Sequence, residues 1–224
     1  VACHCFPYLE KYDMLSNAKK GATFLLASPY SAKEIWDHMP DEVEQQIIDK
    51  KLKFYVIDAA TIARKAGMGS RTNTVLQTAF FKISGIIPAE EAIQHLKDAA
   101  EHSYAKKGMD VVKKNWDCID AAAGAIEQVK YPRTPSGKLR KPATVAADAS
   151  AFVKNVTAKM MEQKGNDLPV SAIPDDGTWP TATTQWEKRN VAAFIPQWDP
   201  SVCIQCGQCS LICPHAAIRM KAYP

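Results

Sequence analysis

The sequence lacks the features of a membrane, secreted or nucleic-acid-binding protein. None of its apolar runs approaches the roughly 18–20 residues that a membrane helix needs, and its first residues resemble neither a signal peptide nor a transit peptide. The net charge of +4 is too small to predict a nucleic acid partner. Internal repeats and low-complexity tracts are also missing. At 224 residues, the chain can form one main globular domain and a small appendage.

Four cysteines near the end of the sequence carry the strongest chemical signal. Cys203, Cys206, Cys209 and Cys213 are spaced C-x2-C-x2-C-x3-C, and Pro214 follows directly. In bacterial iron–sulfur proteins with this spacing, the first three thiolates ligate one [4Fe–4S] cluster and the fourth ligates another. Structural zinc sites instead combine two separated ligand pairs, and cysteines this dense would form disulfides mainly with each other. We therefore predict iron–sulfur ligation and electron transfer.

A second cysteine run, which two clusters would require, is missing from the sequence. Cys3, Cys5 and Cys118 are not arranged in this way, and we interpret them as small, partly buried hydrophobes. Cys3-His4-Cys5 resembles a metal knuckle, but one intervening residue in an extended segment directs the two thiols to opposite faces. We expect the missing ligands beyond Pro224, in a longer polypeptide or in another subunit. Thiolate ligands suit a reducing compartment, so we expect a cytoplasmic protein.

Two short apolar segments, residues 21–28 and 53–58, predict buried strands. Two helix starts lie between them, each with an N-cap residue and an acid three residues later: Ser31 with Glu34, and Asp41 with Glu44. Strand, helices and strand in this order predict a βαβ crossover with parallel pairing.

Helical patterns dominate the next part of the sequence. Helices are predicted over residues 59–66, 72–84, 88–107, 109–129 and 149–163. Residues 130–142 contain three prolines and no acids, which predicts a linker or an exposed loop; the alternative is a docking strip for an acidic electron acceptor. Residues 167–180 predict an irregular arm packed against another surface. We interpret Trp179, Trp186 and Trp198 as packing anchors rather than as electron relays.

The turn between the first two of these helices contains a candidate phosphate site. Its residues are Gly67, Gly69, Ser70, Arg71 and Asn73. Glycines allow close backbone approach, a helix start offers free N–H groups, and the Arg71 guanidinium can bind phosphate with two hydrogen bonds. A plain turn with Thr72 as N-cap explains the pattern equally well.

Several segments in consecutive order carry a family resemblance. They are residues 12–26, 66–73 (Ala-Gly-Met-Gly-Ser-Arg-Thr-Asn), 167–171 (Asp-Leu-Pro-Val-Ser), 176–178, 186–190 (Trp-Glu-Lys-Arg-Asn) and the cysteine run. Together they resemble the pyruvate:ferredoxin (flavodoxin) oxidoreductase family over essentially the whole chain. Ala182 departs from the pattern, because the family usually has glycine there.

The resemblance implies an α/β fold with three parts. These are a three-layer gamma-like domain with a mainly parallel sheet (residues 1–130), a linker, helix and extended arm containing Glu187-Lys188-Arg189 (131–200), and the first half of a ferredoxin-like α+β module with two clusters (201–224). The glycine turn belongs to the domain that the family uses to engage coenzyme A.

The resemblance also implies an activity for the whole enzyme. It is the oxidative decarboxylation of pyruvate to acetyl-coenzyme A, with thiamine diphosphate, magnesium and [4Fe–4S] clusters as cofactors and ferredoxin or flavodoxin as electron acceptor. The other domains of the same enzyme would be the chain's partners, the whole enzyme would be a homodimer, and catalytic residues would lie outside this segment, leaving it inactive alone. The alternative is a free-standing electron-transfer or assembly subunit without a catalytic site.

Overall fold

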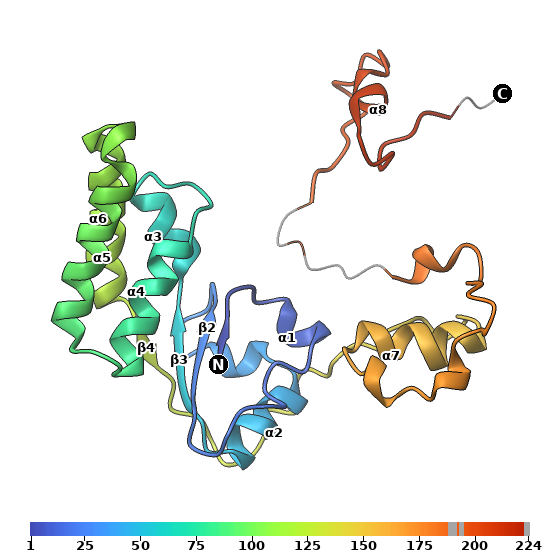
Figure 1. The fold of residues 1–224 in the computed structure, drawn as a ribbon, viewed down its shortest axis with the longest axis horizontal. Coiled ribbons are helices and arrows are strands. Elements are labelled where there is room, and N and C mark those ends of the chain that lie inside the picture. The colour runs from blue at the N-terminus through green and yellow to red at the C-terminus, as the bar shows by residue number, and fades with distance from the viewer. Residues whose placement is uncertain (188–191, 193–194, 222–224) are drawn as a thin grey trace. The chain divides into compact units, whose positions relative to one another are not determined.

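The computed structural model describes residues 1–187, 192 and 195–221. The chain forms two compact units, Val1–Val191 and Ala192–Pro224. Among the described residues, no helix combines the length and apolar character that crossing a membrane requires. The first unit contains the sheet and most of the helices (Figure 1).

A four-stranded sheet forms the centre of the first unit (Figure 1). Its strands lie side by side in chain order: β1 (Ala2–Cys3), β2 (Thr23–Ala27), β3 (Lys53–Ile57) and β4 (Glu127–Gln128). The first three are parallel, and β4 runs antiparallel to β3. The parallel pairing of β2 with β3 confirms the predicted βαβ crossover and an α/β fold with a mainly parallel sheet.

Helices cover both faces of the sheet because side chains alternate along each strand. Phe24 and Leu26 of β2 point to one face, where they pack with α1 (Tyr8–Lys11), the 3-10 turn η1 (Ile35–His38) and α2 (Asp41–Asp49). Leu25 points to the other face. The helices that pack on that face are α3 (Ala59–Lys65), α4 (Asn73–Ser84) and α6 (Met109–Gly124). The helix α5 (Ala89–Tyr104), followed by the turn η2 (Ala105–Lys107), packs on α4 and α6.

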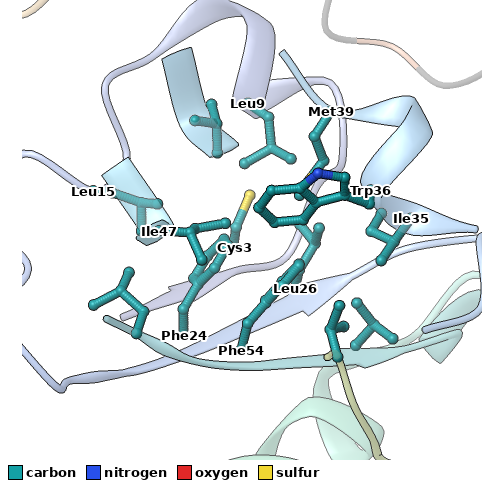
Figure 2. Close-up of a cluster of buried hydrophobic side chains, with 14 of the residues drawn as sticks. Cys3, Leu9, Leu15, Phe24, Leu26, Ile35, Trp36, Met39, Ile47 and Phe54 are labelled. Carbon is teal, nitrogen blue, oxygen red and sulfur yellow. The ribbon is translucent and has the colours of Figure 1, made fainter. Parts of the chain in front are cut away.

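The core of the first face is fully enclosed. Figure 2 shows Phe24 of β2 and Phe54 of β3 among Cys3, Leu9 and Ile47. The rings of Phe24 and Phe54 are stacked, with centroids 5.2 Å apart and planes 12° apart. Both side chains are 0% exposed. Burying a side chain of this size stabilises the fold by about 1.5–3 kcal/mol, so the aromatic pair is a major contributor.

Three predicted element boundaries are wrong. The helix predicted over residues 109–129 ends at Gly124, because the following residues pair with β3 as β4 and the Val129 N–H donates to the Phe54 carbonyl oxygen at 2.9 Å. Asp41 is not an N-cap; Pro40 occupies that position, and Asp41 is the first residue of α2. Ser31 is not an N-cap either, because Glu34 occupies that position of η1, but the Glu34 carboxylate does reach back to accept hydrogen bonds from the Ser31 N–H and hydroxyl.

The rest of the first unit is built from short helical turns. The helix predicted over residues 149–163 contains a π-helical turn, η3 (Val153–Thr157), followed by α7 (Ala158–Met161). Three 3-10 turns follow: η4 (Gly165–Asp167), η5 (Val170–Ala172) and η6 (Thr183–Trp186). This confirms that residues 167–180 are irregular. Their packing against another surface stays a prediction.

Candidate functional site: the cysteine segment and the glycine turn

The four clustered cysteines lie before, within and directly after one short helix of the second unit, α8 (Gln208–Ile212). Cys203 and Cys206 precede the helix, Cys209 lies within it, and Cys213 is its C-cap. Gly207, the N-cap, has φ +73°, a left-handed conformation that disfavours other residues. A Cβ at this position would lie 2.8 Å from the Met220 side chain. The left-handed conformation at this bend therefore favours glycine.

Hydrogen-bond donors stabilise the thiolate form of the two outer cysteines. The side chain of Trp198 donates to the sulfur of Cys203 and, with the backbone of Gln205, lowers the pKa of that thiol. Backbone N–H groups, with Ile218 first, lower the pKa of Cys213, and the Ala217 N–H lies 3.3 Å from Cys213 Sγ. Thiolates are the form that ligates iron. His215 is exposed and contributes a backbone donor to Cys213.

The chemistry of the segment fits a [4Fe–4S] cluster, although its thiols are not gathered. All four cysteines are free, with Cys206 and Cys209 exposed. Within the described ranges, no group of three or more cysteine, histidine or acidic side chains is arranged to hold a metal ion. Several apolar side chains of the segment face solvent: Val202, Ile204, Leu211, Ile212 and Met220. The donor types and the thiolate-stabilising contacts are thus present, and closure of the ligand set requires rearrangement or further residues.

The other three cysteines lie in the first unit and behave as hydrophobes. Cys3 and Cys118 are buried, and Cys5 is half-buried. Burial raises the pKa of Cys3 to about 11 and also raises the pKa of Cys118. The interpretation as small, partly buried hydrophobes is confirmed.

The predicted glycine turn joins α3 to α4. Gly67 and Gly69 have φ of +73° and +63°, so both need glycine's freedom. The N–H groups of Gly67, Met68 and Arg71 donate to backbone carbonyl oxygens within the turn and of α3. They are therefore not available to a ligand. The remaining candidates, Gly69, Ser70, Arg71 and Asn73, have exposed side chains or backbone.

The start of α4 keeps its first N–H groups without a side-chain cap. Thr72 occupies the N-cap position but makes no side-chain cap hydrogen bond. The alternative interpretation, a plain turn capped by the Thr72 side chain, therefore lacks the hydrogen bond on which it depends. A Cβ on Gly67 would lie 3.4 Å from the side chain of Lys114 in α6. Sequence reasoning missed this lysine, because only the packing of α6 against the turn brings the two together.

The basic segment, residues 130–142, is an irregular and mostly exposed loop, which confirms the prediction. It lies along acidic residues of η1 and α2. The contacts are Ser136 with Glu44, Gly137 N–H with Asp41 (2.9 Å), Lys138 with Asp37 (2.7 Å), and Lys141 N–H with Glu42 (3.1 Å). Glu44 is 0% exposed, and burial raises its pKa although Ser136 donates to it. The alternative interpretation assigned this segment to an external acidic electron acceptor. In the folded chain, acidic side chains of η1 and α2 already contact it.

The three tryptophans differ in environment. The Trp179 ring contacts Phe152 edge-on at 4.8 Å, and its indole N–H donates to Thr183, which confirms packing. Trp186 is half-buried. Trp198 is 69% exposed, so its assignment as a packing anchor is wrong; its polar edge contacts Cys203 instead.

The arm includes a strained residue where the sequence departs from the family pattern. Ala182 has φ +62°, the left-handed conformation that glycine adopts without cost. Alanine is therefore accommodated at a cost of about 1 kcal/mol. Of the segment Trp186-Glu-Lys-Arg-Asn, the residues Lys188, Arg189 and Asn190 lie outside the described residues.

Three family models match consecutive parts of the chain. The model described as pyruvate ferredoxin/flavodoxin oxidoreductase matches residues 1–125. A model named EKR, described as a domain of unknown function, matches residues 138–192. A 4Fe-4S binding domain matches residues 196–219, which include all four clustered cysteines.

Curated relatives match the chain over its whole length. The pyruvate-flavodoxin oxidoreductase of Rhodospirillum rubrum is 47% identical over 100% of this chain, and that of a Nostoc species is 45% identical over 100%. The pyruvate:ferredoxin oxidoreductase of Moorella thermoacetica is 44% identical over 98%. In each case the chain spans 19% of the relative's length.

Proposed function

Because the chain belongs to the pyruvate ferredoxin/flavodoxin oxidoreductase family, we propose that it serves an enzyme that oxidatively decarboxylates pyruvate to acetyl-coenzyme A. In this proposal the chain contributes cluster ligands and a coenzyme A-engaging domain. Ferredoxin or flavodoxin receives the electrons. The observation that carries the proposal is the cysteine segment, whose spacing, free thiols and sulfur-directed donors all suit iron–sulfur ligation.

Each clustered cysteine has a role in the proposal. Cys203, Cys206 and Cys209 ligate one [4Fe–4S] cluster, and Cys213 ligates a second. A bound cluster supplies one-electron transfer. Trp198 and the N–H groups near Cys213 hold these sulfurs in the thiolate form and orient them. Hydrogen bonds to sulfur also tune the reduction potential of such centres.

The remaining parts of the proposal concern organisation. We retain the division into a gamma-like domain (1–130), a linker and arm (131–200) and the start of a ferredoxin-like module (201–224). Thiamine diphosphate and magnesium would be held by other parts of the same enzyme, because no segment of this sequence resembles a thiamine-binding site. The glycine turn would contact a phosphate of coenzyme A through Arg71, with Lys114 nearby as a further cation.

Anaerobic reconstitution of the chain tests the ligand assignment. We expect the 224-residue chain to bind less iron than two complete clusters, because Cys213 has no partner cysteines in a second run. Cys203→Ser should reduce bound iron further, and Cys5→Ser, which changes a half-buried cysteine of the other unit, should not. Iron counting and EPR are the measurements. Eight irons per monomeric chain, or equal losses in both variants, would contradict the assignment.

Steady-state kinetics of the whole enzyme test the glycine turn. Arg71→Ala should raise the KM for coenzyme A by about ten- to a hundredfold, since a charged hydrogen bond contributes about 1.5–3 kcal/mol. Arg71→Lys should raise it less, because lysine keeps the charge and loses the paired donors. The KM for pyruvate should hardly change. Arg64→Ala on α3, an exposed arginine that contacts Thr61, is the matched control. Equal effects on both substrates would identify a purely structural turn.

A further inference from the structure

Trp198 is a large aromatic residue whose position hydrophobic burial does not explain. Its side chain is 69% exposed, so the ring gains little stabilisation from packing. The indole has one polar group, the Nε1–H, which can act only as a hydrogen-bond donor. This group donates to the sulfur of Cys203. The contact with sulfur is thus a specific interaction that accounts for the position of the indole.

A tight turn between Trp198 and Cys203 fixes this contact. Asp199 Oδ1 accepts hydrogen bonds from the backbone N–H of Ser201 at 2.9 Å and from its hydroxyl at 2.7 Å. Aspartate side chains that bond the backbone two residues further on define turns of this kind, and Pro200 restricts the backbone within it. The contact is therefore local. A rearrangement that gathers the other clustered cysteines does not need to break it.

The backbone of Gln205 supplies a second donor to the same sulfur. Gln205 has φ +56°, a left-handed conformation that is unfavourable for residues other than glycine. One donor thus precedes Cys203 in the sequence, and the other follows it from a strained position. The surroundings of this sulfur are arranged to supply hydrogen bonds from the protein.

Cys213 differs from Cys203 because its donors belong to the backbone alone. The Ala217 N–H lies 3.3 Å from the Cys213 sulfur, and the other contributing groups are also backbone groups. A backbone donor is present whichever side chain the residue carries, whereas an indole donor depends on the residue type. A single substitution can therefore change the hydrogen bonding of Cys203 without changing that of Cys213.

We propose that the Trp198 indole raises the reduction potential of the [4Fe–4S] cluster that Cys203 ligates. This inference rests on the proposed function, which assigns Cys203 to the first of two clusters. Reduction adds one electron to a cluster and breaks no bond, so the negative charge on its sulfur ligands increases. A hydrogen-bond donor stabilises the more negative state more strongly, and hydrogen bonds to sulfur help to set cluster potentials. Trp198 is thus a positioning residue that makes the first cluster a better electron acceptor.

A second way in which the ring can act predicts the opposite sign. Cys203 is half-buried, whereas Cys206 and Cys209 are exposed. A ring that acted mainly by covering the sulfur would exclude water and disfavour added negative charge. Its removal would then raise the reduction potential. The sign of the change in potential therefore distinguishes hydrogen bonding from covering.

Redox titration of the whole enzyme with dithionite, followed by EPR, tests the proposal. The signal that Cys203→Ser alters identifies the first cluster. Trp198→Phe keeps an aromatic ring and removes the N–H, so it should lower the equilibrium constant for reduction of this cluster by about two- to tenfold. Tenfold corresponds to about 59 mV for a one-electron couple. Trp179→Phe is the matched control, because its indole donates to Thr183 instead, and it should leave the potential unchanged.

A spectroscopic measurement separates the hydrogen bond from a general structural effect. With tryptophan isotopically labelled at the indole nitrogen, pulsed EPR of the reduced enzyme should detect a coupling to the first cluster. Trp198→Phe should abolish this coupling, and Trp179→Phe should preserve it. Asp199→Ala loosens the turn but keeps the indole, so it should lower the potential by less than Trp198→Phe does.

The proposal is overturned if Trp198→Phe raises the potential of the first cluster or leaves it unchanged, or if no indole coupling is detected. It is equally overturned if Trp179→Phe lowers the potential as much as Trp198→Phe does. A cluster signal that Cys203→Ser alters and Trp198→Phe does not shift contradicts this inference alone. If Cys203→Ser alters no cluster signal, the ligand assignment in the proposed function is wrong and this inference is wrong with it.

Discussion

The two units of the chain place the same residue type in opposite environments. Cys3 and Cys118 of the first unit are buried with raised pKa values, whereas Cys203 and Cys213 of the second have lowered ones. Apolar residues show the same contrast: Phe54 is 0% exposed, and Leu211 is 89% exposed. The first unit is stabilised by its own core. The second unit has fewer than about 40 residues, a size at which a bound metal or a partner usually supplies the stability.

The largest expected effect of this contrast is on folding stability. Phe54→Ala should lower the free energy of unfolding of the first unit by about 3–5 kcal/mol, because it removes a fully buried ring stacked on Phe24. Leu211→Ala in the metal-free chain should change the free energy of unfolding by less than about 0.5 kcal/mol. Urea unfolding followed by far-UV circular dichroism measures both. A comparable loss from Leu211→Ala would show that the second unit has a core of its own.

Thiol reactivity offers the next largest effect. With its pKa at about 11 instead of 9.0, Cys3 has about a hundredfold smaller thiolate fraction at neutral pH than an ordinary cysteine. Cys203 and Cys213 should therefore be alkylated by iodoacetamide at least a hundredfold faster than Cys3 in the metal-free chain at pH 7.5. Peptide mapping by mass spectrometry gives the individual rates. Fast labelling of Cys3 would indicate that the edge at β1 opens readily.

A smaller effect is expected from Glu44, the buried acid that holds the basic segment. Its folded-state pKa is raised above 4.5, so the folded state binds the proton more tightly than the unfolded state does. The resulting stabilisation is full below pH 4.5 and is lost as the pH rises through the folded-state pKa. The stability difference between the unmodified chain and Glu44→Gln should therefore decrease with rising pH.

Urea unfolding of both chains between pH 4 and pH 8 measures this difference, and the subtraction cancels the other carboxylates. A difference that grows with pH would mean that the donors from Ser136 outweigh the burial of the charge.

Sequence patterns predicted the elements that are stabilised locally. Strands β2 and β3 and the helices α3, α4 and α5 follow from apolar periodicity and from glycine or proline at their ends. Strand β4 was missed because Glu127 and Gln128 carry no strand signature; their pairing with Tyr55 and Val56 decides their conformation. Pairing of this kind depends on residues far away in the chain.

The sites show the same division. The spacing of the clustered cysteines is a local feature of the sequence and was sufficient to predict them as ligands. The contact between Trp198 and Cys203 joins residues that are close in sequence, but no sequence pattern indicates it. Glu44 was assigned to a helix cap, yet its partner is Ser136, which only the folded chain brings to α2. A cleft lined by residues 10–13, by α2 and by the chain from Lys141 to Lys164 depends on packing between segments distant in sequence, so no periodicity or motif predicts it.

The identity of strand order and chain order has a consequence for the sequence of folding events. Strands β1 to β3 can pair as soon as each successive strand is available. Strand β4 follows α3 to α6 in the chain, so a long loop must close before Glu127 can pair with Val56 of β3, and we expect this pairing to form later. We expect the basic segment, which follows β4, to dock last. Until then the carboxylates of α2 lack the hydrogen bonds that Ser136, Gly137 and Lys141 donate to them in the folded chain. The final docking step therefore pairs the first part of the domain with the segment that completes it.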